Sequence, residues 1–254
     1  MWLLRSSRIS VRSHRRIQSR IKRIKAMRVL ELFAGSRSIG KVANELGIEV
    51  FSVDIEAFEG IDLIADIEFL TIADLPWVPD LVIAGVPCTS YSICGIRHHR
   101  KNLKPTSKFA VKSDRLVQAV LLLVADLGCP YFIENPRGLL RKMDFMQFSE
   151  RRTIWYCQYG DHRAKPTDLF SNDFYGMFNL NGWQPRNECH NGNNFCHHDK
   201  QPRSYKRRKE IGLEKCGTSG MSGSFQRSMY PRELCIDLLL HYQWQVDQFR
   251  SPIV

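Results

Sequence analysis

The sequence contains no apolar run that approaches the length of a membrane-spanning helix, for which about 20 consecutive apolar residues are needed. Its first residues also lack the apolar core of a secretory signal. A chain of 254 residues with 43% hydrophobic content can bury one substantial core, with a small appended module. These features predict a soluble globular protein without a membrane partner.

Cysteine is too thinly spread for a disulfide framework. The chain has eight cysteines, whereas disulfide-stabilised domains are short and cysteine-dense. Four of them lie in or beside apolar segments, namely Cys88, Cys94, Cys129 and Cys157. This usage is typical of a reducing compartment and favours a cytoplasmic protein.

Acidic residues are absent from the first 26 residues, which contain nine Lys and Arg. Most of the net charge of +11 therefore belongs to this tail, and the rest of the chain is close to neutral. Such a segment can be a basic nucleic-acid arm, an organelle transit peptide, or sequence upstream of a true start at Met27. We expect residues 1–26 to be a disordered or marginally helical tail without a catalytic role.

The first turn of the predicted core lacks the G-x-G-x-x-G pattern of dinucleotide sites. Residues 29–33 (VLELF) have the pattern of a strand, a turn with the single Gly35 follows, and an amphipathic helix then ends at Gly47. A second strand over 50–53 is followed by Asp54, which can accept hydrogen bonds from both ribose hydroxyls of a nucleoside. One glycine in the turn favours a nucleoside without phosphates over a dinucleotide.

The central stretch of the chain is DLVIAGVPCTSYSICG, from Asp80 to Gly95. Residues 81–84 form a short apolar run, the pattern of a strand buried on both faces. Gly85 and Pro87 end this run, so Cys88 follows the carboxyl end of the strand, where ligands bind in open parallel sheets. Cys88 is either a nucleophile on a loop or a structural cysteine at a strand end.

Two acids follow predicted strands farther along the chain. Asp66 comes after a short apolar segment and can accept a hydrogen bond from an adenine amine. A helix is expected over 113–127, capped by Ser113 or Asp114. The next strand, 131–133, leads into Glu134, which should share a sheet edge with Cys88. A thiol beside a carboxyl group suits nucleophilic attack coupled to proton donation, although Glu134 alone can equally be a capping or solvent-facing acid.

Taken in this order, these motifs resemble those of the cytosine carbon-5 DNA methyltransferases, which use S-adenosylmethionine. ELFAGSRSIG at 31–40 resembles the cofactor-binding motif of that family, and AGVPCTSYSICG at 84–95 resembles its nucleophile motif. Glu134-Asn135 resembles its Glu-Asn motif, and Arg163-Ala164-Lys165 its Arg-x-Arg motif. The resemblance covers about residues 27–170.

Several positions depart from the pattern of the family. Thr89 stands in place of a Gln, Pro136 in place of a Val, and Lys165 in place of the second Arg, and no clear Gly-Asn-Ser motif is found near the C-terminus. The segment before Arg163 is also short. These departures indicate a compact, divergent branch of the kind found in phage and prophage, acting in the cytoplasm of a bacterial or phage-infected cell.

The resemblance implies an α/β, Rossmann-like S-adenosylmethionine-dependent methyltransferase fold, with a mostly parallel sheet flanked by helices. It implies transfer of a methyl group to cytosine carbon 5 by a monomer acting on double-stranded DNA, through covalent attack of Cys88 on carbon 6 of a flipped-out base. Glu134 would assist at ring N3, and Arg163 would help to favour the thiolate. The cofactor-binding residues would be Phe33, Ala34, Gly35, Ser36, Asp54, Ile55, Asp66, Ile67 and Pro87.

The segment 97–115 follows the nucleophile and is strongly basic, with Asp114 as its one acid. Loops can be basic merely for solubility, but the position of this one favours phosphate contacts and closure over nucleic acid. The residues expected to contact nucleic acid are Ser90, Arg97, Arg100, Lys101, Lys165, Arg203, Arg207 and Arg227.

In the last third of the chain the apolar residues are less regularly spaced. The catalytic core is expected over 27–172, a small irregular target-recognition insert over 173–226, and over 227–254 a helix that starts at Pro231 and packs on the core. No metal is required, but the insert contains a weak candidate zinc site, formed by Cys189, Cys196, His198 and Cys216.

Two other functions remain compatible with the sequence. An RNA cytosine methyltransferase would share nearly all of these motifs. A catalytically silent DNA-binding homologue would be expected to lose the cysteine or the glutamate, and the chain has both.

Overall fold

The computed structural model describes residues 27–93, 95–173, 182–190, 210 and 228–250. Their central element is a seven-stranded sheet with the order β3-β2-β1-β4-β7-β9-β8. Its strands are β1 Arg28–Leu32, β2 Glu49–Asp54, β3 Leu63–Ile64, β4 Leu81–Gly85, β7 Tyr131–Pro136, β8 Glu150–Trp155 and β9 Pro166–Ser171. Only β9 runs against its neighbours, β7 and β8. The sheet is therefore mostly parallel, and the Rossmann-like α/β fold class predicted from the sequence is confirmed.

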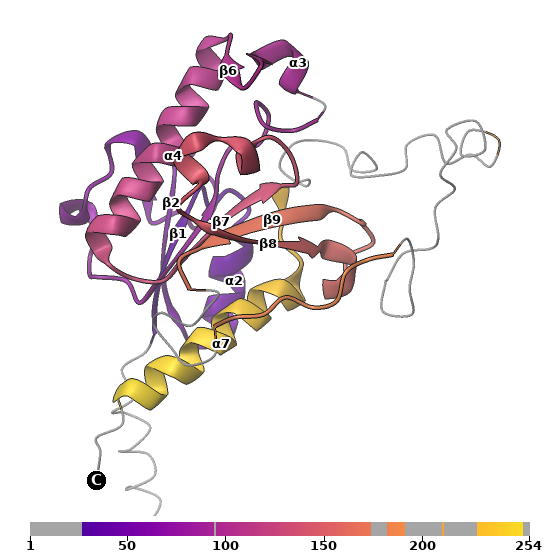
Figure 1. Cartoon of the computed structure of the whole chain (residues 1–254). Coiled ribbons are helices and arrows are strands. Elements are labelled where there is room, and N and C mark those ends of the chain that lie inside the picture. The colour runs from indigo at the N-terminus through magenta and orange to yellow at the C-terminus, as the bar shows by residue number, and fades with distance from the viewer. Residues whose placement is uncertain (1–26, 94, 174–181, 191–209, 211–227, 251–254) are drawn as a thin grey trace, which may run out of the picture.

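Helices cover both faces of the sheet (Figure 1). Helices α2 (Ser38–Glu45) and α7 (Arg232–Arg250) pack together on one face. Their apolar side chains join those of β1, β4 and β7 in one buried cluster, to which α7 contributes Leu234, Cys235, Leu238, Leu239 and Tyr242. Helix α7 thus lies on the core, and its regular part begins one residue after Pro231.

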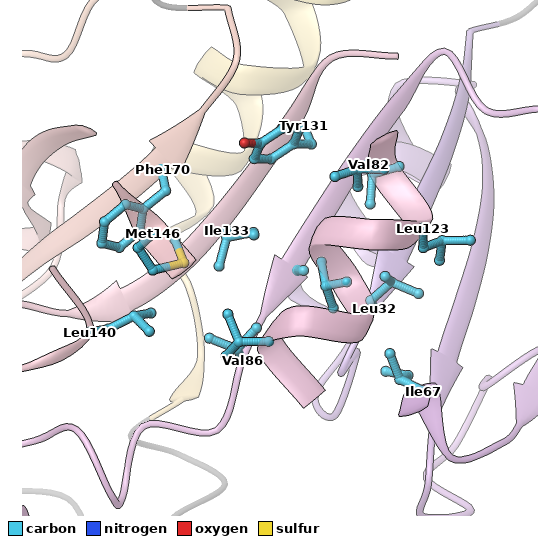
Figure 2. Close-up of a cluster of buried hydrophobic side chains, with 14 of the residues drawn as sticks. Leu32, Ile67, Val82, Val86, Leu123, Tyr131, Ile133, Leu140, Met146 and Phe170 are labelled. Atoms are coloured by element: carbon cyan, nitrogen blue, oxygen red, sulfur yellow. The ribbon is translucent and has the colours of Figure 1, made fainter. Parts of the chain in front are cut away.

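The opposite face carries α4 (Lys108–Leu127) and a second buried cluster, shown in Figure 2. Val82 of β4, Ile133 of β7 and Leu123 of α4 belong to this cluster. The short turns η3 (Leu140–Lys142) and η4 (Asp144–Met146) close it with Leu140 and Met146. Because β1, β4 and β7 carry buried residues on both faces, they read in the sequence as continuous apolar runs.

The start of α4 was predicted wrongly. The helix begins at Lys108 and not near Ser113, and its N-cap is Ser107, whose hydroxyl accepts a hydrogen bond from the amide of Ala110. Ser113 lies inside the helix and donates its hydroxyl to the carbonyl of Phe109. In the first turn the apolar residues Phe109 and Val111 are exposed and only Ala110 is buried, so the regular apolar face becomes clear only after Ser113.

The remaining short elements lie in the connections. They are η1 Ile67–Phe69, η2 Ile72–Asp74, α3 Ile96–His99, the hairpin strands β5 Arg100–Lys101 and β6 Lys104–Pro105, and η5 Tyr156–Tyr159. None of the described helices is long and apolar enough to cross a membrane. The predicted tail (1–26) lies outside the described residues, as does most of the predicted insert (173–226).

Candidate active site

Cys88 and Glu134 are carried to the same edge of the sheet by two neighbouring strands. β4 and β7 are parallel, and Gly85 at the end of β4 pairs in register with Glu134. Cys88 follows β4 by three residues and is half-buried, while Glu134 is buried. Glu134 lies within β7 rather than just past its end, because the strand continues through Asn135 to Pro136. The sheet fixes its backbone from both sides.

One oxygen of Glu134 is held by two donors. The hydroxyl of Tyr156 donates to Oε1 at 3.0 Å, and Nζ of Lys165 approaches the same atom at 3.3 Å. Lys165 Nζ also lies 4.5 Å from the centre of the Tyr156 ring. All three side chains are buried. Burial, and next the charge of Glu134, raise the pKa of Tyr156 well above its ordinary value, so Tyr156 remains a donor.

Arg163 lies beside Tyr156, on the edge of the cluster formed by Glu134, Tyr156 and Lys165. Its guanidinium is paired with Asp161, donates to the carbonyl of Met229 at 3.0 Å, and lies 5.2 Å from the centre of the Tyr156 ring. Its predicted effect on the Cys88 thiol stays a prediction.

The loop after Cys88 is anchored by a buried ion pair. Arg100 donates to both oxygens of Asp114, at 2.5 and 3.0 Å, and to the carbonyl of Ser90 at 2.9 Å. Tyr91, fully buried, donates its hydroxyl to Asp114 at 2.6 Å. The amides of Tyr91 and Ser92 in turn donate to the carbonyl of Cys88. Cys88 is thus carried by a tightly held turn.

Asp54 closes the glycine turn against the end of β2. Its Oδ2 accepts from the amide of Gly35 at 2.9 Å, and its Oδ1 accepts from the amide of Glu56 at 3.0 Å. Phe33 and Gly35 both have positive φ, at 55° and 45°. The backbone therefore turns sharply between β1 and α2, and only Gly35 adopts such a conformation without strain.

Beneath this turn lies Glu31, a buried acid that the sequence reasoning missed. Its carboxylate accepts from the amides of Ile39 and Gly40, at 3.0 and 3.1 Å, and from the hydroxyl of Ser52 at 2.8 Å. Burial nevertheless raises the pKa of Glu31 to about 7. An acid inside an otherwise apolar strand, just before a glycine turn, was the available signal.

The other predicted cofactor-binding residues differ in burial and in whether they already have a hydrogen-bond partner. Asp66 caps η1 and pairs with Lys112 at 2.6 Å, and this hydrogen bond lowers the pKa of Asp66. Ala34, Ser36 and Ile67 are buried, Pro87 is half-buried, and Ile55 is exposed. Asp66 thus already has a partner, whereas Asp54 uses only part of its accepting capacity.

A second missed residue is Tyr230, which precedes α7. Its amide donates to Ser38 in the first turn of α2 at 3.1 Å. Its hydroxyl is buried and has no hydrogen-bond partner among the described residues. A Cβ added to Gly85 would lie 2.6 Å from that hydroxyl and 3.9 Å from the carbonyl of Phe33. Burial, and then the charge of Glu134, raise the pKa of Tyr230 well above its ordinary value. The position of Tyr230 could not be predicted, because it lies far along the sequence from the residues it contacts, in a segment whose apolar residues have no regular spacing.

The predicted nucleic-acid residues divide into two groups. Arg97 and Lys101 are exposed on α3 and β5. Ser90, Arg100 and Lys165 are buried, and the two basic side chains face internal carboxylates. The guanidinium of Arg100 therefore serves inside this structure as an anchor of the loop that follows Cys88. Arg203, Arg207 and Arg227 lie outside the described residues.

Of the candidate zinc ligands, only Cys189 lies among the described residues, where it is half-buried. Cys196, His198 and Cys216 lie outside them. Within the described ranges, no three His, Cys, Asp or Glu side chains gather in a way that could hold a metal ion.

No protein-family model matches the sequence, and no curated protein matches it. Among solved structures, the chain is similar to the Entamoeba histolytica methyltransferase EhMeth, with 13% identity and a TM-score of 0.45, over 71% of this chain and 58% of that one. A DNMT2 variant from Spodoptera frugiperda shows 14% identity and a TM-score of 0.43, over 70% and 56%. The glycopeptide N-methyltransferase MtfA, complexed with S-adenosylmethionine, shows 13% identity and a TM-score of 0.26, over 56% and 60%.

This chain therefore spans less than two thirds of the length of each of these three structures. The similarity concerns the course of the backbone, and no role of a side chain follows from it. The chemistry has to be argued from the side chains at the edge of the sheet.

Proposed function

We propose that this protein transfers a methyl group from S-adenosylmethionine to carbon 5 of cytosine in DNA. The observation that supports this most is the pairing of β4 with β7, which brings the thiol of Cys88 and the carboxyl group of Glu134 to one edge of the sheet. The glycine turn of β1 lies at the same edge, because β1 and β4 are parallel neighbours. A nucleophile, a proton donor and a nucleoside-binding turn are thus adjacent.

The residues of the glycine turn fit S-adenosylmethionine. Asp54 accepts one hydrogen bond on each oxygen, and a carboxylate has about four accepting positions, so it can still receive ribose hydroxyls. The hydroxyl of Tyr230 is buried and has no hydrogen-bond partner among the described residues, so it can pair with a polar end of such a ligand. When bound, S-adenosylmethionine supplies an electrophilic methyl group.

The protein's own contribution is to make cytosine carbon 5 nucleophilic. The Cys88 thiolate forms a bond to carbon 6, the electrons of the C5=C6 bond move toward the C4–N3 unit, and Glu134 gives a proton to N3. The resulting ring is an enamine that can take a methyl group at carbon 5. Water then takes the carbon-5 proton, Cys88 leaves as the thiolate, and the N3 proton returns to the Glu134 carboxylate, which restores the aromatic ring.

A cytosine inside a duplex cannot reach Cys88, so the proposed substrate base is flipped out of double-stranded DNA. Arg97 and Lys101, exposed on the segment that follows the nucleophile, are suited to contact the phosphates on either side. We propose that the protein acts as a monomer on the DNA of a bacterial or phage-infected cell.

The test is covalent trapping. DNA with 5-fluorocytosine blocks the final loss of the substituent at carbon 5, so the wild-type protein with S-adenosylmethionine should form a complex that survives a denaturing gel. Cys88→Ala should form none and should bind S-adenosylmethionine within a few-fold of wild type, because the thiol contacts the base.

Nucleoside mass spectrometry of treated DNA and RNA identifies the product. 5-Methylcytosine in DNA supports the proposal, and 5-methylcytosine in RNA alone would replace it with the RNA alternative. Absence of trapping on both nucleic acids would overturn cytosine methylation by this chain.

A further inference from the structure

Glu134 has to carry its proton on a particular oxygen if the proposed reaction is to work. The reaction moves that proton to ring N3, so the proton must lie on the oxygen that faces the base. A carboxyl group in water carries its proton on either oxygen. The surroundings of Glu134 decide between them.

The two oxygens of Glu134 differ sharply in their contacts. Oε1 receives the Tyr156 hydroxyl at 3.0 Å and the Lys165 ammonium group at 3.3 Å. No described residue donates a hydrogen bond to Oε2, and Oε2 is not among the fully buried unpaired atoms. Both partners of Oε1 are donors. Lys165 has no acceptor, and its Nζ also donates to the hydroxyl oxygen of Tyr156 at 3.5 Å, so the tyrosine donates its own hydrogen to Glu134. A proton on Oε1 would collide with them.

We infer that Tyr156 is a positioning residue that, together with Lys165, confines the carboxyl proton of Glu134 to Oε2. The inference rests on the proposed function and assigns to this tyrosine a role in the proton transfer. Tyr156 is fully buried on η5, between β8 and β9, and does not itself reach the base side of Glu134.

The charge balance of the addition step gives Tyr156 a second effect. The thiolate of Cys88 brings one negative charge, and the neutral carboxyl group of Glu134 brings the proton. When the sulfur–carbon 6 bond has formed and the proton has moved from Oε2 to N3, the negative charge is on the Glu134 carboxylate. There it faces the hydroxyl of Tyr156 and the ammonium group of Lys165, so both donors stabilise the adduct more than the starting state. Expulsion of Cys88 returns the proton to Oε2.

Four titratable or charged side chains face Glu134, from different parts of the chain. Tyr156 and Lys165 bond to it, and the charges of Arg163 and Tyr230 interact with it from beside η5 and from the segment before α7. Of these four side chains, Tyr156 can lose its hydrogen-bonding group through the removal of one oxygen atom, with no change of net charge. That makes Tyr156→Phe the informative variant.

The experiment measures the rate of covalent trapping on 5-fluorocytosine DNA as a function of pH. In Tyr156→Phe, we expect trapping at the pH of its maximal rate to slow by about 10- to 100-fold, the range typical of a lost hydrogen bond to a charged group. The fall in trapping rate at alkaline pH, the alkaline limb of the profile, should also move to higher pH, because a carboxylate that loses a hydrogen-bond donor holds its proton more tightly. Affinity for S-adenosylmethionine should be unchanged.

Tyr131→Phe is the matched control. Tyr131 is a buried tyrosine of β7 whose hydroxyl bonds to Ser149 at 2.8 Å, away from Glu134. This variant should trap at the wild-type rate and with the wild-type pH profile. A double variant separates a direct effect from a structural one: in a Glu134→Gln background, Tyr156→Phe should slow trapping no further. Additional slowing there would overturn the inference.

The outcomes distinguish this inference from the proposed function. Failure of wild type to trap overturns the function itself. Normal trapping by a folded Tyr156→Phe protein overturns the inference alone. If Tyr156→Phe does not fold, 3-fluorotyrosine placed at 156 provides a more acidic donor, and the alkaline limb should move to lower pH. An unmoved limb there would overturn the inference.

Discussion

Asp54 serves the fold and the proposed cofactor site with one carboxylate, which makes it a sensitive residue to change. In Asp54→Ala, the affinity for S-adenosylmethionine should fall by roughly 1–3 kcal/mol, the cost of leaving polar partners unpaired. Calorimetry measures this directly. Asp126→Ala is the control, since Asp126 is an exposed acid on α4. Equal affinity in the two variants would place the ribose elsewhere.

Glu31 predicts an unusual dependence of stability on pH. Its pKa is raised from 4.5 to about 7 by burial, so the folded protein binds more protons than the unfolded chain between these values. The stability that the protonated group contributes is complete below about pH 4.5 and is lost as the pH rises toward 7, by about 3 kcal/mol in total. Other carboxylates with lowered pKa change stability in the opposite direction, so a variant is needed to isolate the effect.

Glu31→Gln supplies that comparison. Its amide cannot titrate and must turn its NH₂ toward the amide of Ile39 or Gly40, so the variant should be less stable than wild type. The free-energy difference between the two, from urea unfolding at pH 5 and pH 7.5, should shrink at the higher pH. A constant difference would show that Glu31 is ionised throughout.

At the scale of residues, the sequence predicted that Cys88 and Glu134 share a sheet edge, as the structure has them, and missed the side chains of Tyr156 and Tyr230. Cys88 and Glu134 could be predicted because each follows or ends an apolar run, and the carboxyl ends of parallel strands share an edge. Tyr156 and Tyr230 could not, because each is an aromatic residue that reads as core. Their roles depend on contacts with residues 22 positions away in one case and 192 in the other.

Among the elements, the turn after β7 helps to hold the loop that follows Cys88. Leu139 donates its amide to the carbonyl of Tyr91 at 2.8 Å, and a methyl group on Gly138 would collide with that same carbonyl. Gly138→Ala should therefore displace the loop that carries Cys88, lower the free energy of unfolding by about 1–3 kcal/mol, and slow trapping.

Gly128→Ala separates these two effects. Gly128 ends α4 with a φ of 61° and has open space around its missing side chain, so alanine there costs backbone strain of about 1 kcal/mol without touching the loop. It should trap at the wild-type rate. Equal slowing in both variants would attribute the effect of Gly138→Ala to stability alone.

The strands and helices were predicted best where the spacing of apolar residues and the turn residues at the ends of a segment indicate the same boundaries. The strands at 29–33, 50–53 and 81–84 correspond to β1, β2 and β4 within one or two residues. The predicted beginning of α4 was wrong because two apolar residues of its first turn, Phe109 and Val111, are exposed and do not continue the buried face, and because Ser107 is the capping residue. The hairpin of β5 and β6 escaped notice because each strand has two residues.

For the whole molecule, the motif order predicted the parallel half of the sheet but not the rest. β9 inserts antiparallel between β7 and β8, so neighbours along the chain are not neighbours in the sheet. That placement depends on burial of both faces of β9, which is Pro166–Ser171 and is almost wholly buried. No local pattern specifies which strand a buried segment will join.

The position of α7 has a consequence for the order in which the protein folds. The helix covers the face of the sheet that α2 shares, and the amide of Tyr230, which precedes it, donates to Ser38, 192 positions earlier in the sequence. A chain whose α7 has not yet docked contains both Cys88 and Glu134, but its core is uncovered on that face. We therefore expect covalent trapping to require a docked α7. A chain shortened to residues 1–227 can be tested for trapping, and trapping at the wild-type rate would refute this requirement.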